Sequence, residues 1–478
     1  MCGIFINVDG ESSRLNSISH RGIESNTIER EGVFLSHVRL PIQTQEGDGW
    51  KQPIQISSGI FLLYNGEVFN YDRTVFGSDI EYICQTFATW KGGSLQMFCS
   101  MFIPKIQTWD GFWSIAIYDS KTKDIICFTD PLGKKCLYTN DDGELSSEIK
   151  AVKHWFSPHD SHFISTVRKF GYVTDDSTPY RDVKRILPNT IYHYNLEVPN
   201  FKSTYPNYYR SFNFPIQNLT PGDYEAHMDW LWTKLFESVR NRLISKNYPI
   251  SLLVSGGLDS SIIAGVLSQM APEVKWFSIE NGESKFVNIL SEFYQKQVNF
   301  LDYNMDESRL KKIYQEWNES PIDLGSVIPQ FFLFEAVKNQ GDSRIVLSGD
   351  GADELFGGYS RIHEYDSQFS DIFDELRFYH LPRLDKLSMA HTLELRNPFL
   401  HLDIVRFSLH LPKEWRTDKK ILKDTFGPLL PPEIVDRPKE ALKNPRIKED
   451  KLKYRQQAVD LFLETEQTKS FSESEVDI

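Results

Sequence analysis

An apolar segment, a glycine turn and a second apolar segment follow one another in Ile250-Ser251-Leu252-Leu253-Val254-Ser255-Gly256-Gly257-Leu258-Asp259-Ser260-Ser261-Ile262-Ile263. The first segment predicts a buried strand that ends at Val254, and the two glycines predict a sharp turn. The apolar residues after the turn predict the buried face of a helix. Such a strand, turn and helix direct backbone N–H groups and a helix N-terminus at phosphate. The stretch therefore predicts an α/β domain that binds a nucleotide at this turn.

The turn differs from two common nucleotide loops. No Gly-Lys-Ser/Thr follows it, as in a Walker loop, and it lacks the Gly-x-Gly-x-x-Gly spacing of a dinucleotide site. It resembles the Ser-Gly-Gly-Leu-Asp-Ser loop of ATP pyrophosphatases, which split ATP between its α and β phosphates. The resemblance implies that ATP is bound by Ser255, Gly256, Gly257, Asp259 and Ser260.

A second apolar run, residues 344–347, leads into Ser348-Gly349-Asp350-Gly351-Ala352-Asp353-Glu354. Acidic residues at the end of a parallel strand lie where α/β sheets bind ligands. Three carboxylates in five positions repel one another unless a cation joins them, and Mg²⁺ takes carboxylate and phosphate oxygens together. We predict that Asp259 and Asp350 bind Mg²⁺ beside the ATP phosphates. The alternative for this run is a solvated acidic turn.

Residues 225–445 resemble the synthetase domain of the asparagine synthetase family. The resemblance rests on the two loops above, on residues 384–400 and on Arg437-Pro438-Lys439-Glu440. It implies that Val254 and Ile279 flank adenine, that Ser348 and Gly349 contact the nucleotide, and that Asp350 and Lys439 are catalytic. Taken alone, Lys439 is an ordinary surface lysine. The chain departs from the family at His401, where Asp is usual, and after Phe277, where Glu280 and Glu283 stand in a shortened segment.

The opposite end of the chain begins Met1-Cys2-Gly3-Ile4-Phe5. Methionine aminopeptidases remove Met before a small residue, so the mature chain would start with Cys2. An α-amine titrates near pH ~8, which leaves part of it as an unprotonated base beside the Cys2 thiol at neutral pH. A thiol with its own base is a self-contained nucleophile. The alternative is that Cys2 is an accident of the first codons.

Polar residues near the apolar runs of the first 205 residues supply the rest of such a site. Arg39 ends an apolar strand and offers a bidentate clamp for a carboxylate. Asp79 opens a helix predicted over 78–90 and offers a partner for an ammonium group. Asn65 and Gly66, predicted in a tight turn after a strand, offer an oxyanion hole. Each has a plainer interpretation, namely a rim salt bridge for Arg39, a helix cap for Asp79 and a hairpin turn for Asn65-Gly66.

The region resembles the glutaminase domain of class II (N-terminal nucleophile) glutamine amidotransferases. The resemblance implies a four-layer αββα sandwich, an Ntn hydrolase-like fold that releases ammonia from glutamine through a Cys2 thioester. It also implies that glutamine is bound by Arg39, Leu40, Asn65, Gly66, Glu67 and Asp79. One departure is His20-Arg21-Gly22-Ile23-Glu24, where the family usually has Pro-Asp after the glycine. The motifs that carry the resemblance are residues 1–5, 37–40, 65–70, 77–79, 109–112, 129–133 and 147–150.

Bulk properties narrow the class of protein. The chain has 478 residues and a formal net charge of −13, which disfavours a nucleic-acid or anionic-membrane protein because either needs a basic face. No apolar run is as long as a membrane span, and five cysteines without Cys-x-x-Cys spacing favour a reducing cytoplasm. We expect a glutaminase domain over 1–205, a linker over 206–222, a synthetase domain over 223–445 and a charged, partly disordered tail over 446–478.

Together the two halves predict an enzyme that uses ATP, Mg²⁺ and glutamine to turn a carboxylate into an amide, with aspartate as the expected acid and asparagine as the product. The alternatives are an amidotransferase that acts on another carboxylate and a non-catalytic relative. A lactam-forming enzyme is disfavoured because it needs no glutaminase. No nucleic-acid or membrane partner is expected, and a homodimer stays open.

Overall fold

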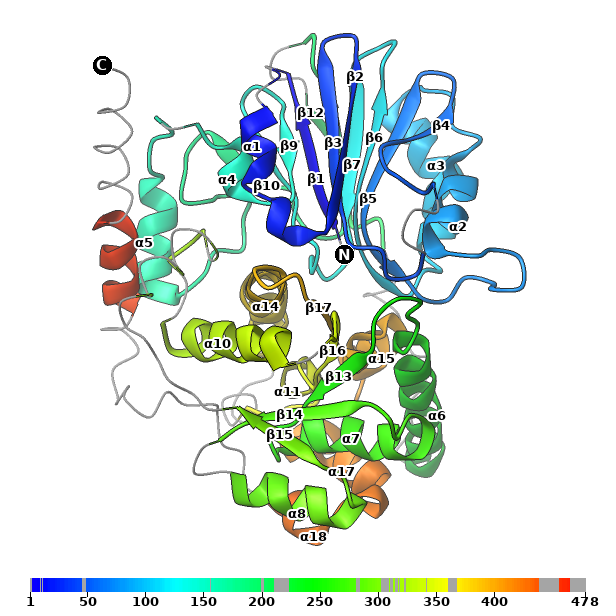
Figure 1. Ribbon diagram of the computed structural model, residues 1–478, viewed down its shortest axis with the longest axis vertical. Coiled ribbons are helices and arrows are strands. Elements are labelled where there is room, and N and C mark those ends of the chain that lie inside the picture. Colours follow the sequence, from blue (N-terminus) through cyan, green and yellow to red (C-terminus); the bar gives the residue numbers. More distant parts are fainter. Residues whose placement is uncertain are drawn as a thin grey trace.

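The structure is a computed structural model of the chain. It describes residues 2–8, 10, 12–44, 49–154, 156–198, 202–209, 223–280, 284–301, 309, 313, 317, 319–321, 324–340, 342–359, 368–437 and 455–464. Two sheets lie face to face in the N-terminal half, and a third sheet lies in the C-terminal half (Figure 1).

The two N-terminal sheets are antiparallel in their paired strands and have six strands each. The first has the order β10-β8-β9-β1-β3-β2, and the second has the order β12-β11-β7-β6-β5-β4. The strands are β1 (Cys2–Asn7), β2 (Glu24–Arg30), β3 (Val33–Arg39), β4 (Ile54–Ser57), β5 (Ile60–Val68), β6 (Gly111–Asp119), β7 (Asp124–Thr129), β8 (Tyr138–Asn140), β9 (Leu145–Ser146), β10 (Val183–Arg185), β11 (Thr190–Asn195) and β12 (Lys202–Pro206).

Alternation along the strands divides the buried residues between two layers. Ile4 and Ile6 of β1 meet Phe61 and Leu63 of β5 between the sheets. Phe5 points the other way and packs with residues of the helices on the first sheet, while α2 and α3 cover the second sheet. This arrangement confirms the predicted αββα sandwich. The helices are α1 (Ser12–Asn16), η1 (Ser19–Arg21), α2 (Asp79–Phe87), α3 (Leu95–Ile106), α4 (Ile149–Val152) and α5 (Ser161–Phe170).

The third sheet has five parallel strands in the order β15-β14-β13-β16-β17. The strands β16 and β17 are fully buried, whereas β15 at the other edge is mostly half-buried, and the burial of β16 explains its apolar run in the sequence. The sheet confirms the predicted α/β fold of this half. The strands are β13 (Ile250–Leu253), β14 (Lys275–Ile279), β15 (Val298–Leu301), β16 (Ile345–Leu347) and β17 (Glu394–Arg396).

Helices surround this sheet, and α14 lies between it and the N-terminal sandwich (Figure 1). The helices are α6 (Tyr224–Arg242), α7 (Leu258–Met270), α8 (Ser284–Tyr294), α10 (Leu324–Gln340), α11 (Ala352–Leu355), α13 (Gln368–Glu375), η6 (Leu376–His380), α14 (Leu381–Met389), η7 (Pro398–Leu400), α15 (Leu402–Leu409), α16 (Lys413–Arg416), η8 (Thr417–Lys419), α17 (Lys420–Phe426), η9 (Gly427–Leu429) and α18 (Pro432–Val435).

Two predictions fall partly outside the described residues. Most of the linker expected over 206–222 lies there, and so does most of the tail expected over 446–478, including its last dozen residues. Residues 455–464 of the tail are described, and they form a helix whose Val459 is buried against α5. Among the described residues, no helix combines the length and the apolar character that crossing a bilayer requires.

Candidate active sites

Cys2 begins β1 and lies directly opposite Arg39 of β3. Its backbone N–H donates a hydrogen bond of 3.0 Å to Asn65 Oδ1, a partner from the second sheet. Burial raises the pKa of the Cys2 thiol, while the Leu40 backbone N–H and the Arg39 guanidinium act in the opposite direction. A buried thiol needs a nearby base to react as a thiolate, so the site depends on a group that can take the Cys2 proton.

The prediction of a tight turn at Asn65-Gly66 is wrong, because both residues lie inside β5. Gly66 pairs with Trp113 of β6, and a Cβ at this position would lie 2.1 Å from the carbonyl oxygen of Phe112. Glycine is therefore required by the close approach of two strands rather than by a turn. Asn65 Oδ1 faces Cys2, and its Nδ2 makes a long bond of 3.4 Å to Ser114 Oγ.

Asp79 is the first residue of α2, and Ser78 caps that helix. The buried carboxylate of Asp79 accepts hydrogen bonds from Tyr64 Oη at 2.8 Å, from the Val68 N–H at 3.2 Å and from the Ile80 N–H at 2.9 Å. Burial raises the pKa of Asp79 to about 6, and these three donors limit the rise. The carboxylate is held in one orientation between β5 and α2, where it can receive an ammonium group.

Arg39 is buried at the end of β3, where its guanidinium is already engaged by Glu24 and Thr44. Its Nη1 lies 2.7 Å from Glu24 Oε1, and its Nη2 donates to Thr44 Oγ1. Glu24 stands in the segment where the sequence departs from the family pattern. It lines a small cavity together with Arg39 and His37. A substrate carboxylate at Arg39 would therefore meet a guanidinium that Glu24 partly neutralises.

Glu67 is buried near the end of β5 and receives contacts from both halves of the chain. Gln43 Nε2 donates to its carboxylate, and Tyr71 Oη donates to Gln43 Oε1 at 2.8 Å. Arg396 of β17 lies 3.7 Å from the same carboxylate. Burial and the neighbouring Glu394 raise the pKa of Glu67, and Arg396 opposes this rise.

The predicted nucleotide loop joins β13 to α7. The buried Val254 donates its N–H to Phe277 O at 2.9 Å, which extends the pairing with β14 toward Ile279. Ser260 Oγ accepts from the Ser255 N–H at 3.1 Å and closes the loop on itself. Gly256 has a φ of +67°, and a Cβ there would lie 2.7 Å from the Cβ of Phe286, so no other residue fits.

The loop after β16 packs directly against this first loop. A Cβ at Gly349 would lie 2.7 Å from the Asp259 carbonyl carbon and 2.7 Å from the Ser260 nitrogen. The glycine therefore lets the Ser348-Gly349-Asp350 segment touch the start of α7. Both predicted nucleotide loops meet at the carboxyl ends of neighbouring parallel strands, where such sheets bind ligands.

The acidic residues of these loops have different partners. Lys419 Nζ lies 2.6 Å from Asp259 Oδ2 and 2.5 Å from Asp353 Oδ1, so two carboxylates converge on one ammonium group. Those carboxylates raise the pKa of Lys419 despite its burial. Asp350 instead accepts a hydrogen bond of 2.5 Å from Ser348 Oγ. Among the described residues, no group of three or more His, Cys, Asp or Glu side chains is arranged to hold a metal ion.

Two further signature positions lie near these sites. Arg437 Nη1 donates to Gly256 O at 2.7 Å, so the Arg-Pro-Lys-Glu segment starts beside the nucleotide loop, while Lys439 lies outside the described residues. His401 caps α15 by accepting the Asp403 N–H at 3.1 Å, and it lies 3.5 Å from Asp110 of the N-terminal half. His401, which differs from the residue usual in the family, therefore lies at a contact between the two halves of the chain.

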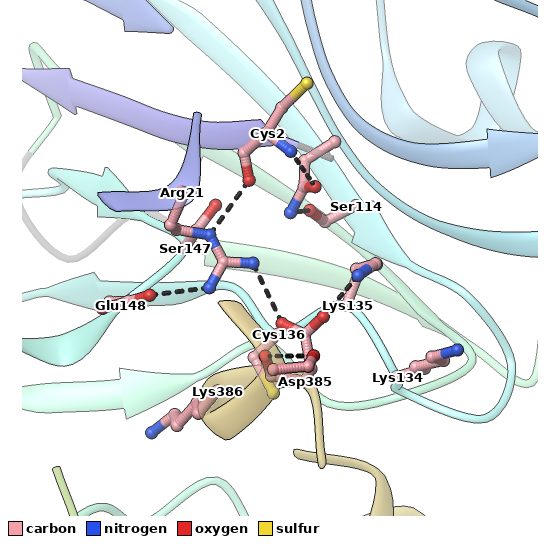
Figure 2. Close-up of polar contacts among 12 residues, drawn as sticks. Cys2, Arg21, Ser114, Lys134, Lys135, Cys136, Ser147, Glu148, Asp385 and Lys386 are labelled. Atoms are coloured by element: carbon pink, nitrogen blue, oxygen red, sulfur yellow. Dashed lines mark hydrogen bonds and ion pairs between the residues drawn. The ribbon is translucent and has the colours of Figure 1, made fainter. Parts of the chain in front are cut away.

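Several residues of the sites were not predicted from the sequence. Tyr64 and Thr44 lie in no recognisable motif, and Lys419 is 160 positions from its partner Asp259. Arg21 lies in the departing segment, but its role could not be inferred. Its Nε donates to the Cys2 carbonyl oxygen at 3.0 Å, and its Nη2 reaches Asp385 of α14 at 2.9 Å, as Figure 2 shows.

Comparisons with known proteins match each half of the chain to a family. The sequence model described as asparagine synthase matches residues 232–378 and 367–475, and the one described as glutamine amidotransferase domain matches residues 1–208. A probable glutamine-hydrolysing asparagine synthetase of Acanthamoeba polyphaga mimivirus is 24% identical and is aligned over 92% of this chain and 84% of its own length. The glutamine-hydrolysing asparagine synthetase of Homo sapiens is 27% identical over 82% of this chain and 73% of its own length.

Among solved structures, a glutamine phosphoribosylpyrophosphate amidotransferase from B. subtilis matches at a TM-score of 0.30 and 13% identity. The match covers 73% of this chain and 81% of that chain. The two family matches together span nearly the whole chain, with one family on each half. The chain is therefore a member of the asparagine synthase family, a glutamine-dependent ligase with an N-terminal glutamine amidotransferase domain.

Proposed function

We propose that this enzyme converts L-aspartate, L-glutamine and ATP into L-asparagine, L-glutamate, AMP and diphosphate. Glutamine-hydrolysing, ATP-dependent amide synthesis is the activity of the family. Aspartate as the acid is supported by the names of the relatives. The observation that carries the proposal is the bond between the Cys2 N–H and Asn65, in a chain whose other half brings two nucleotide loops together.

At the first site, Cys2 is the nucleophile. After removal of Met1, its amine lies beside Asn65 Oδ1 and can take the thiol proton. The sulfur attacks the side-chain amide carbon of glutamine, ammonia leaves, and water then hydrolyses the thioester to glutamate. Arg39 and Asp79 hold the carboxylate and the ammonium group of glutamine. Leu40, Gly66 and Glu67 complete its pocket.

The Asn65 side chain also has an amide group for the oxyanion. Its Oδ1 accepts from Cys2, while its Nδ2 has, among the described residues, a single long bond, to Ser114. A donor so weakly engaged can turn toward negative charge that develops on the substrate carbonyl oxygen. The Gly66 backbone N–H is the second donor in this proposal.

At the second site, a carboxylate oxygen of aspartate attacks the α-phosphorus of ATP, and diphosphate leaves. Val254 and Ile279 flank adenine, and the loops that contain Ser255–Ser260 and Ser348-Gly349 bind the phosphates. Ammonia then attacks the acyl carbon, and AMP leaves with the electrons of the broken bond. Asp350 and Lys439 are the proposed catalytic groups of this half.

Mg²⁺ fits this site on the chemistry of its side chains. Asp259 and Asp353 already converge on one cationic group, and carboxylates with phosphate oxygens are the ligands that Mg²⁺ prefers. Asp350, three positions before Asp353, stays a proposed ligand with Asp259. When bound, the ion would neutralise charge on the departing diphosphate.

Ammonia made at Cys2 has to reach the acyl-adenylate before it is protonated in water. A buried interface between the halves is suited to this transfer. Arg242 and Asp110 form a two-contact ion pair there, with N–O distances of 3.1 and 3.2 Å, and both side chains are almost fully buried.

We also propose the division expected from the sequence, with domains over 1–205 and 223–445, a linker over 206–222 and a tail over 446–478. A cytoplasmic location is proposed because all five cysteines are unpaired. A homodimer stays an open proposal. The rival functions are amidation of another carboxylate and a non-catalytic role.

The test is diphosphate release over a panel of carboxylic acids, with glutamine and Mg-ATP supplied. We expect release with aspartate and none above background with acids that differ in length or charge. Release with another acid alone would replace aspartate, and no release with any acid would favour the non-catalytic rival. Cys2→Ala should lose synthesis from glutamine and keep synthesis from ammonia, whereas equal loss of both would contradict the division of labour.

A further inference from the structure

Lys134 crosses the boundary between the two halves of the chain. It follows β7 in the N-terminal half, and its Nζ donates to Asn397 Oδ1 at 2.7 Å and to the carbonyl oxygen of Leu395. Both acceptors belong to the C-terminal half, at and just after β17. Lys134 is only 3% exposed and Asn397 only 1%, so solvent does not compete for these bonds.

The contacts continue from Asn397 to the nucleotide site. Asn397 Nδ2 donates to Ser348 Oγ at 2.9 Å, and Ser348 Oγ donates to Asp350 Oδ2 at 2.5 Å. Three consecutive hydrogen bonds therefore join Lys134, in the N-terminal half, to the Asp350 carboxylate, which is proposed to act on ATP. Each member of the chain is buried or half-buried.

The chemistry of the groups fixes the direction of this chain. Lys134 donates to two carbonyl-type oxygens, so the amide oxygen of Asn397 faces the lysine and its NH₂ faces Ser348. Ser348 has a single hydroxyl hydrogen, which is then directed at Asp350. Bonds that all run donor to acceptor in one direction polarise one another and end on the carboxylate.

Burial lowers the pKa of Lys134, and the neighbouring Lys135 adds to this effect. The bonds do not depend on the protonation state, because a neutral amine still has two hydrogens for Leu395 and Asn397. The ammonium form is also stabilised by the Phe112 ring, whose centroid lies 4.0 Å from Nζ.

We propose that Lys134 of the glutaminase half is a positioning residue for the synthetase site, acting on Asp350 through Asn397 and Ser348. The inference rests on the function proposed above. It makes the synthetase site depend on a lysine of the glutaminase half through the side chains of Asn397 and Ser348. The adjacent Lys135 pairs with Asp385 instead, as Figure 2 shows, so its ammonium group is not a member of this chain of hydrogen bonds.

The alternative is that Lys134 only stabilises the contact between the two halves. The two interpretations differ for Lys134→Met, which keeps the length of the stem and removes the donor. A purely structural role predicts a lower free energy of unfolding and an equal loss of activity at both sites. The proposed role predicts ammonia-dependent diphosphate release about 10- to 100-fold slower in kcat, with glutamine hydrolysis in the absence of ATP unchanged within about twofold.

The matched control is Lys386→Met. Lys386 is also a buried lysine of this boundary, where it lies 3.1 Å from Glu319, which accepts the N–H groups of Ile149 and Lys150. No bond in the described residues leads from Lys386 to Asp350. We expect this variant to lose stability without the selective fall in kcat.

A second variant, Asn397→Asp, tests the direction of the chain. It keeps an oxygen for Lys134 but replaces the NH₂ group by an acceptor, so the Ser348 hydrogen turns toward residue 397 and leaves Asp350. We expect the same selective loss of diphosphate release from a well-folded protein. Normal release from Asn397→Asp would overturn the proposal.

Hydrogen exchange gives a measurement that does not require activity. In Lys134→Met, the amides of 346–351 should exchange about tenfold faster, while those of β1 and β3 stay unchanged. Unchanged exchange at 346–351, or parallel loss at both sites in Lys134→Met and Lys386→Met alike, would overturn the role of Lys134. If the parent chain releases no diphosphate while the exchange result holds, the proposed function fails and the positioning contact stands.

Discussion

Asp79 is the residue whose environment most directly predicts a pH dependence. Burial between β5 and α2 raises its pKa to about 6. Below that pH the carboxyl group of the free enzyme is protonated and carries no charge for the ammonium group of glutamine. We expect kcat/KM for glutamine to fall as the pH drops through about 6 and to be flat, as far as this group is concerned, above pH 7.

The variant Asp79→Asn separates this residue from other titrating groups. An Asn keeps an oxygen for Tyr64 and Val68 but has no charge, so KM for glutamine should rise about 100-fold. The fall near pH 6 should vanish as well. Synthesis from ammonia, measured at a constant concentration of free NH₃, should be unaffected. A fall near pH 6 that persists in Asp79→Asn would assign the pH dependence to another group.

Some site residues could be predicted from the sequence because their type and position indicate the chemistry they can perform. Cys2, Arg39 and Asp79 were predicted from residue type and position, and the structure gathers them around β1, β3 and α2. The ion pair between Glu24 and Arg39 could not be predicted, because it depends on the register of β2 and β3. Lys419 could not be predicted either, since no local pattern marks the partner of an acid 160 residues away.

At the scale of elements, the apolar runs before the two nucleotide loops predicted β13 and β16, because both are inner strands of a parallel sheet. Strands such as β2 and β12 have no such run, because one side of each is exposed. The error at Gly66 has a clear physical origin. Glycine serves both turns and close strand contacts, and only the position of Phe112 on β6 decides between them. The contact between the two nucleotide loops was expected from their place at the ends of parallel strands.

That loop contact leads to a prediction for Gly349→Ala. The new Cβ would lie 2.7 Å from backbone atoms of Asp259 and Ser260, which cannot move as a flexible side chain would. We expect diphosphate release to fall at least about 100-fold, because the two loops are pushed apart. Glutamine hydrolysis, measured without ATP, should stay within about twofold of the parent.

Gly427→Ala is the matched control in the same half of the chain. The nearest atoms to a Cβ there are the Val435 methyl groups at 3.9 Å, an ordinary van der Waals contact. This variant should keep both activities. If Gly349→Ala also kept diphosphate release, the close contact of the loops would not matter for the nucleotide.

At the scale of the molecule, the halves meet through buried charges as well as apolar side chains. Arg21 and Lys135 both reach Asp385, and Arg242 reaches Asp110. A buried carboxylate that loses its partner leaves an uncompensated charge, which is far costlier than breaking an exposed pair. These contacts join residues more than 100 positions apart, so no sequence pattern could have predicted them.

Asp110→Asn tests whether this boundary stabilises the whole chain. Burial alone would raise the pKa of Asp110, but Arg242 and His401 lower it below its ordinary value, so the wild-type pair contributes stability that is lost as the pH falls below about 4. The variant replaces the charged acceptor of Arg242 by a neutral one, and the free energy of unfolding at pH 7 should fall by about 3–5 kcal/mol in denaturant titrations. The control is Asp424→Asn, which breaks an exposed pair with Lys420 and should change stability by no more than about 0.5 kcal/mol. Equal effects of the two variants would mean that the halves are joined by apolar packing and that the buried ion pair contributes little stability. The loss of wild-type stability expected below about pH 4 should then be absent too.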